Sequence, residues 1–208
     1  LEIYLNNQLY KKFRNDEISI ISDDEEIKYI RYGIEQLLAA DYIMTDNFTF
    51  VKDLKFDHVH RRRTWLGEDM LGVGISAHSC FNDIIFQNEP DIEAYRQKIN
   101  AGTLPIFRAH ASTKNEVIRQ RIIFGIKNLH INRKIFYNEF GIDCVEMFKD
   151  EFKYLESMKF IKISSEYIET TLEGLIFADD IVRIFFLPEH QNKMLAHIFT
   201  NNIGRSQQ

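Results

Sequence analysis

The sequence contains few cysteines, only Cys80 and Cys144 in 208 residues. Two separated thiols in a chain of this size are typical of a reducing, cytoplasmic setting, with both side chains inert and packed. A basic excess is also absent, because the net charge is −5, whereas a general nucleic-acid binder normally carries a basic stripe. No run of eighteen apolar residues occurs, so we expect no membrane-spanning helix, and no signal peptide is visible.

The apolar content is sufficient for a folded protein. Apolar residues make up 45% of the chain, and 17 phenylalanines and 9 tyrosines make it rich in aromatic side chains. A chain of this length and composition can bury one good core or two small ones.

Two capping boxes indicate where long helices begin. Ser22 with Glu25, and Thr113 with Glu116, have the spacing at which the first side chain and the third residue after it cap each other. We expect the first helix to end near residues 40–41 and the second to run through Leu129. The residues expected to face the interior are Ile27, Ile30, Ile34, Leu37 and Leu38 in the first helix and Val117, Ile118, Ile122 and Ile126 in the second.

Alternation and turn residues predict the remaining elements. We expect strands at residues 1–5, 42–45 and 48–51, helices at 91–101, at 133–140, from 143 and from 171 to 186, and a hairpin of 160–163 with 167–170. The helix from Asp143 has an apolar stripe consisting of Val145, Phe148, Phe152 and Leu155. Helices followed by a hairpin wing and another helix indicate a winged-helix-like domain, and residues 201–208 form a loose tail.

The segment from Asp69 to Ser79 is the most informative part of the chain. Residues 70–75 are predicted to form a buried strand that opens into a tight loop, because Gly72 and Gly74 allow close approach of the backbone. Small side chains there leave room for a ligand, and His78 with the following serine supplies polar atoms. Alternatively, the glycines only permit close packing of a helix against a strand.

A dense basic cluster is present at residues 58–63. It is either a solvated loop or an anion site, because the guanidinium groups of Arg61, Arg62 and Arg63 match carboxylate and phosphate geometry. A zinc site formed by His58 and His60 is disfavoured, because no cysteine or third histidine lies nearby in sequence.

Further motifs follow the glycine-rich segment in a definite order. They are a G-x-G-x-x-A-x-S pattern at residues 72–79, Gln87-Asn88 with Tyr95, Gly102 with Pro105, and a helix with Arg119, Arg121 and Gly125. Taken together, the chain resembles the C-terminal half of the oxygen-independent coproporphyrinogen III oxidase family, the HemN-like radical SAM proteins. The resemblance covers roughly residues 1–187.

The resemblance implies an α+β fold, in which the end of a partial (β/α) radical SAM barrel precedes a helical, winged-helix-like C-terminal domain. The implied domains are the end of the barrel with the glycine-rich strand (1–80), a connecting segment with a short helix (81–111), the winged-helix-like domain (112–187) and a C-terminal tail (188–208).

The resemblance also implies S-adenosylmethionine (SAM) and a four-iron–four-sulfur cluster as cofactors, and a tetrapyrrole or similar substrate. Gly72, Gly74, Ala77 and His78 would contact SAM, and residues 61–63 would bind substrate carboxylates. The position of His78 is apolar in the coproporphyrinogen oxidases, so this chain departs from their pattern there. The family's C-x3-C-x2-C cluster motif is absent from these residues, so we expect the cluster on an upstream barrel part, which would be the partner of this chain, and no activity from the chain alone.

Other functions of the same family remain open from the sequence. A radical SAM methyltransferase is one, and a haem-binding chaperone is another, with His78, His110, His130 or Met147 as candidate iron ligands. A winged-helix nucleic-acid binder is the third. The helix from Asp143 carries more acidic than basic residues and would be repelled by phosphates, so we expect no nucleic acid as partner. We expect no membrane as partner either, because no apolar run is long enough to cross one.

Overall fold

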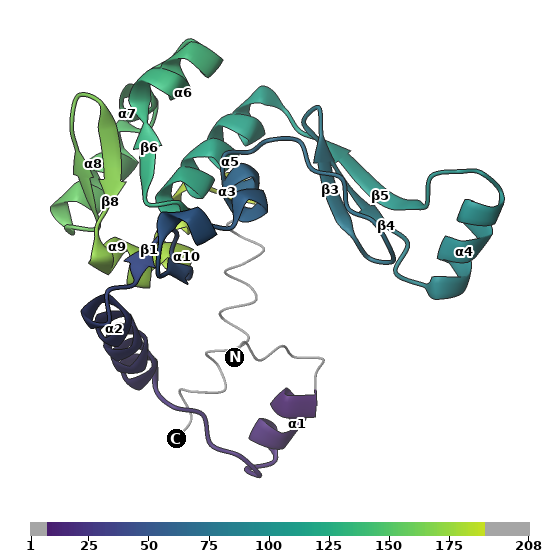
Figure 1. Cartoon of the computed structure of the whole chain (residues 1–208), viewed down its shortest axis with the longest axis horizontal. Helices are drawn as coiled ribbons and strands as arrows, with labels where there is room; N and C mark the ends of the chain where they lie inside the picture. Colours follow the sequence, from purple (N-terminus) through teal and green to yellow (C-terminus); the bar gives the residue numbers. More distant parts are fainter. Residues whose placement is uncertain (1–7, 190–208) are drawn as a thin grey trace. The chain divides into compact units, whose positions relative to one another are not determined.

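The computed structural model describes residues 8–189 and contains both helices and short sheets, as expected for an α+β chain (Figure 1). It divides into two compact units after Tyr42. The strand predicted at residues 1–5 and the tail at 201–208 lie outside the described residues. A search of the described helices finds none that is long and apolar enough to cross a membrane.

The described residues of the first unit form the helices α1 (Gln8–Arg14) and α2 (Asp23–Ala39). The capping box predicted at the start of α2 is confirmed. The Ser22 hydroxyl accepts a hydrogen bond from the Glu25 amide, and the Glu25 carboxylate accepts one from the Ser22 amide. Ile34 is the buried member of the predicted apolar stripe, so the buried face of α2 is narrower than its sequence pattern indicates.

The second unit begins with a short antiparallel strand pair and two helical segments. These elements are β1 (Ile43–Met44), β2 (Phe50–Val51), the 3-10 helix η1 (Leu54–Phe56) and α3 (Val59–Trp65). The strands lie within the two segments predicted as strands. The interpretation of residues 58–63 as a loop is wrong, because His58 caps α3 by accepting a hydrogen bond from the Arg61 amide at Nδ1.

A three-stranded antiparallel sheet follows, in the order β3–β4–β5 (Figure 1). Its elements are β3 (His78–Phe81), β4 (Ile84–Asn88), β5 (Ile106–Ala111) and the connecting helix α4 (Ile92–Asn100), which was predicted. The strand predicted at residues 70–75 is wrong, because Met70 alone forms a bridge, to Cys80, and the ladder begins at His78. The side chains that gave this segment its alternation are exposed and cannot anchor a buried strand: Leu71, Val73 and Ile75.

The main hydrophobic core lies between the later helices and a second sheet of order β6–β8–β7, of which β6 and β8 are labelled in Figure 1. The elements are α5 (Lys114–Lys127), β6 (His130–Asn132), α6 (Arg133–Phe140), α7 (Cys144–Met147), α8 (Lys149–Ser157), β7 (Ile161–Ile163) and β8 (Tyr167–Thr170). The second capping box and the β7–β8 hairpin are confirmed. The predicted core residues that are buried are Val117, Ile118, Ile122, Ile126, Phe148, Phe152 and Leu155.

The last predicted helix, from Thr171 to residue 186, is broken into three short pieces. They are α9 (Leu172–Ile176), α10 (Ala178–Ile181) and the 3-10 helix η2 (Val182–Phe185). Thr171 caps α9 as predicted, by accepting a hydrogen bond from the Gly174 amide. The single-helix prediction is wrong because the first piece ends at Phe177 and the last piece is a more tightly wound 3-10 helix. These changes keep successive apolar side chains against the same core.

Both cysteines are expected to resist alkylation in the folded protein. Burial raises the pKa of the Cys144 thiol to about 11, and burial followed by the charges of Asp83 and Asp69 raises the pKa of Cys80. A raised pKa leaves less reactive thiolate at neutral pH. Iodoacetamide at pH 7.5, followed by mass spectrometry, should modify Cys80 slowly and Cys144 only after unfolding in urea. Equal labelling of Cys144 with and without urea would contradict its burial.

Candidate functional site

The glycine-rich segment forms a loop at residues 71–77. Its base is closed by the Met70–Cys80 bridge, in which each backbone amide donates a hydrogen bond to the carbonyl of the other residue, at 2.7 and 2.9 Å. His78, the first residue of β3, lies directly after the loop and is exposed. The chain therefore brings the four residues predicted to contact SAM into one short segment, and they are Gly72, Gly74, Ala77 and His78.

The two glycines of this loop are required for different physical reasons. A Cβ atom on Gly72 would lie 2.4 Å from the carbonyl oxygen of His78 and 2.9 Å from Cβ of Ala77. Gly74 has a φ of +103°, which L side chains rarely adopt, and no atom lies within 4 Å of the position of its missing Cβ. The alternative interpretation, in which the glycines permit close packing of a helix against a strand, is wrong, because the close neighbours of Gly72 are atoms of Ala77 and His78 and not of a helix.

Two buried polar side chains hold the loop. The Ser79 hydroxyl, which is 1% exposed, accepts a hydrogen bond from the Gly72 amide at 2.9 Å. The side-chain amide of Asn88, which is 5% exposed, donates to the carbonyls of Gly74 and Gly72, at 2.9 and 3.3 Å. The Asn88 backbone amide also donates to the Ala77 carbonyl. The sequence predicted no such role for Ser79 or Asn88. The feature that could have indicated it is that Ser79 ends the G-x-G-x-x-A-x-S motif and Asn88 belongs to the Q-N motif.

The basic cluster forms three separate ion pairs along α3. Arg61 pairs with Asp46 at 2.6 Å, Arg62 with Asp57 at 3.2 Å, and Arg63 with Glu68 at 2.8 Å. The Arg61 guanidinium also lies 6.0 Å from the centre of the Trp65 ring. Arg62 and Arg63 are exposed, and exposed pairs of this kind contribute little to stability. A carboxylate ligand could therefore compete for these two side chains more readily than for Arg61.

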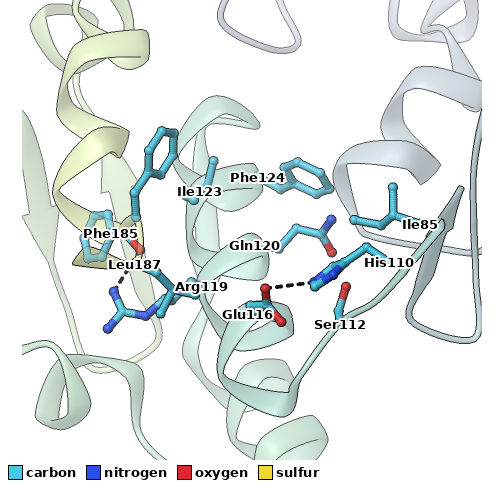
Figure 2. Close-up of a pocket in the computed structure, with 11 residues that line it drawn as sticks. Ile85, His110, Ser112, Glu116, Arg119, Gln120, Ile123, Phe124, Phe185 and Leu187 are labelled. Atoms are coloured by element: carbon cyan, nitrogen blue, oxygen red, sulfur yellow. Dashed lines mark hydrogen bonds and ion pairs between the residues drawn. The ribbon is translucent and has the colours of Figure 1, made fainter. Parts of the chain in front are cut away.

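A pocket of about 410 Å³ lies between β5, α5 and the end of η2 (Figure 2). Its lining residues are Ile85, His110, Ser112, Glu116, Arg119, Gln120, Ile123, Phe124, Phe185, Phe186 and Leu187. His110 and Ser112 line one side together with Glu116 of α5, whereas Phe185 and Leu187 line the other (Figure 2). The pocket therefore has an apolar interior, a polar edge at His110, Ser112 and Glu116, and the charged side chain of Arg119 on the other side.

The polar edge of this pocket is organised by the capping box of α5. The hydrogen bond from the Thr113 backbone amide is the main cause that lowers the pKa of the Glu116 carboxyl, and the Thr113 hydroxyl is the next. His110, whose Nε2 atom lies 2.9 Å from the Glu116 carboxylate, lowers this pKa further. On the other side, Arg119 donates to the Phe185 carbonyl at 2.8 Å, and its guanidinium lies 4.9 Å from the centre of the Phe148 ring. Sequence reasoning named His110 only as a candidate iron ligand and missed the pocket.

The candidate iron ligands lie on different elements. His78, His110 and His130 belong to β3, β5 and β6, and Met147 ends α7. The His130 ring packs edge-on against Tyr167, with 5.5 Å between the ring centres. Among residues 8–189, no three histidine, cysteine or acidic side chains are grouped so as to hold a metal ion. The described residues thus offer no site for a four-iron–four-sulfur cluster.

Known proteins are similar to this chain in sequence and in fold. No family model matches it. The oxygen-independent coproporphyrinogen III oxidase of Pseudomonas aeruginosa is 27% identical over 194 residues, which cover 85% of this chain and 42% of that enzyme. The enzyme of the same name from Helicobacter pylori strain J99 is 25% identical over 174 residues, covering 76% of this chain and 38% of that protein.

The fold is similar to that of a solved structure, the coproporphyrinogen III oxidase HemN of Escherichia coli, which is described as a radical SAM enzyme. The TM-score is 0.61 at 18% identity, and the match covers 79% of this chain and 42% of that one. SAM and an iron–sulfur cluster, the cofactors implied by the resemblance, are those of the radical SAM class. The chain spans about two fifths of the length of the Pseudomonas enzyme, consistent with a C-terminal portion. The predicted resemblance is therefore confirmed, and this chain is similar in sequence and in fold to the HemN-like oxygen-independent coproporphyrinogen III oxidases.

Proposed function

We propose that this chain is the C-terminal part of an enzyme that uses SAM for radical chemistry on a tetrapyrrole or a similar conjugated substrate. The observation that carries the proposal is the glycine-rich loop at residues 71–77, which is fixed from behind by buried side chains and open on its outer side. It lies in a chain whose relatives are named for the oxidation of coproporphyrinogen III.

The loop suits a bound cofactor. Gly72 and Gly74 have no side chains, so a ligand can approach the backbone closely, and His78 adds an exposed imidazole at the start of β3. When bound to a cluster and cleaved, SAM supplies the radical. The described residues fit contact with SAM but not ligation of the cluster, because they contain no group of three suitable ligands. The proposal therefore places the cluster on another part of the complete protein.

Two further features support a substrate with an apolar ring system and carboxylates. The pocket beside α5 has an apolar interior with polar side chains at its margins, which suits a pyrrole ring. Arg62 and Arg63 are exposed, and their partners Asp57 and Glu68 are 14% and 45% exposed, so substrate carboxylates could replace those partners. In this proposal residues 1–80 form the end of the radical SAM barrel, and residues 81–111 connect it to the next domain. Residues 112–187 form a winged-helix-like domain beside the substrate. We place the activity in the cytoplasm on the basis of cysteine usage.

Replacing His78 by alanine is expected to weaken SAM binding about tenfold, the effect of one lost hydrogen bond to a ligand. The side chain is exposed, so the melting temperature should change little. Isothermal titration calorimetry of SAM into the complete protein, with its cluster reconstituted, provides the measurement. His130→Ala, which removes another exposed imidazole on β6, is the matched control. Unfolding by His78→Ala, with full affinity in the fraction that remains folded, would make His78 a structural residue and end the assignment.

A further inference from the structure

The side chain of Asn88 lies behind the glycine-rich loop, at the end of β4. It is 5% exposed, and its amide nitrogen lies 2.9 Å from the Gly74 carbonyl oxygen and 3.3 Å from that of Gly72. A side-chain amide has two N–H donors, so both are used on these two carbonyls. Most buried polar groups in folded proteins have hydrogen-bond partners, and these two carbonyls supply the partners of the Asn88 amide.

The direction of these two carbonyls determines the direction of two amides. The described chain has no cis peptide bond, and in a trans peptide the N–H of a residue points opposite to the C=O of the residue before it. Because the carbonyls of Gly72 and Gly74 point toward Asn88, the amides of Val73 and Ile75 point away from it. Neither amide has a hydrogen-bond acceptor among residues 8–189.

The outer side of the loop is open to solvent at these positions. The Val73 side chain is 92% exposed, and that of Ile75 is also exposed. Two amide donors two residues apart, on a backbone held from behind, resemble the free edge of a strand. They offer fixed hydrogen bonds to acceptor atoms, and SAM carries such acceptors in its carboxylate, its ribose hydroxyls and its purine nitrogens.

We infer that Asn88 is a positioning residue, whose amide orients the loop so that the Val73 and Ile75 amides face bound SAM. The identity of the ligand, SAM, rests on the proposed function. The role of Asn88 in orienting the loop rests on its hydrogen bonds to the two carbonyls. Asn88 does not touch the ligand, and it acts through the carbonyls of Gly72 and Gly74. Ser79 assists from the other end, where its hydroxyl accepts a hydrogen bond from the Gly72 amide.

The test is Asn88→Asp, which keeps the shape of the side chain but replaces its N–H donors with a carboxylate oxygen that repels both carbonyls. Hydrogen–deuterium exchange should then be about tenfold faster at the Gly72 and Ser76 amides, which the folded loop protects. In the complete protein, with its cluster reconstituted, SAM affinity should fall about tenfold. If Asn88→Asp does not fold, Ser79→Ala is measured in its place. This variant removes one hydrogen bond to the loop and should show a smaller change of the same kind.

Asn115→Asp is the matched control, because it makes the same chemical change on the exposed first turn of α5 and keeps the acceptor for Arg119. It should leave loop exchange and SAM affinity unchanged. Unchanged exchange in the loop of Asn88→Asp, or faster exchange with full SAM affinity, would overturn the inference. Absence of SAM binding by the unsubstituted protein would instead overturn the proposed function. The exchange measurement needs no SAM, so it tests the contact between Asn88 and the loop separately.

Discussion

Replacement of Phe152 by alanine is expected to lower the free energy of unfolding by about 3–5 kcal/mol, the usual cost of removing a buried phenylalanine ring. Its side chain is 0% exposed and shares one core with Ile122 and Ile126. Its ring centre lies 5.2 Å from that of Phe185, in a tilted arrangement. Urea denaturation at 25 °C, followed by circular dichroism, measures the change. The residual cavity would be lined by apolar groups and would stay dry, so no polar contact offsets the loss.

Tyr154 provides the control for this experiment. It lies on the same helix, α8, but it is 53% exposed, so Tyr154→Ala should change the unfolding free energy by only about 0.5 kcal/mol. A loss below about 1 kcal/mol for Phe152→Ala would mean that the stripe of α8 does not face the core. The winged-helix-like arrangement proposed for residues 112–187 would then be wrong.

The substitution Gly72→Ala is expected to lower the free energy of unfolding by about 1–3 kcal/mol, because the new methyl group overlaps backbone atoms that cannot rotate away. The nearest atom, the His78 carbonyl oxygen, would lie 2.4 Å from it. Relief requires movement of the loop away from Ser79 and Asn88, so SAM affinity should fall as well. Urea denaturation and titration calorimetry of the complete protein measure the two effects.

Gly33→Ala is the matched control for this second substitution. Gly33 lies within α2, and no atom is found within 4 Å of the position of its missing Cβ. Alanine there should stabilise the helix by about 0.5–1 kcal/mol, because glycine is the poorer helix former. Equal stability of Gly72→Ala and the unsubstituted protein would show that the loop adjusts freely, against the fixed geometry described above.

The start of each long helix and the late hairpin could be predicted because their signals are local. Ser22 with Glu25, and Thr113 with Glu116, lie within one helical turn, so four consecutive residues contain all the information that the cap requires. The core stripe of α5 was predicted for the same reason, since its period is visible in the sequence. Elements whose ends depend on distant contacts, such as the three short helices after Thr171, could not be predicted in this way.

The structure describes the segment that contains the predicted SAM-contacting residues, and the local structure predicted for that segment is wrong. Residues 70–75 alternate like a strand, yet the carbonyls of Gly72 and Gly74 bond to the side chain of Asn88, more than ten positions away. Nothing in the segment itself indicates this partner. Within the protein the close contact is at Gly72, whereas Gly74 has a φ of +103° and no protein atom within 4 Å of the position of its missing Cβ. Backbone direction and buried polar partners are tertiary properties that residue spacing does not encode.

The strand order β6–β8–β7 has a consequence for folding. β8 pairs with β7 across a short turn, so that contact closes a small loop, whereas the Ile131–Ile168 pair closes a loop containing α6, α7 and α8. Loop-closure entropy therefore favours early formation of the hairpin and late docking of β6. During synthesis β6 leaves the ribosome well before its partner, and until β8 follows, its backbone groups have no strand to pair with.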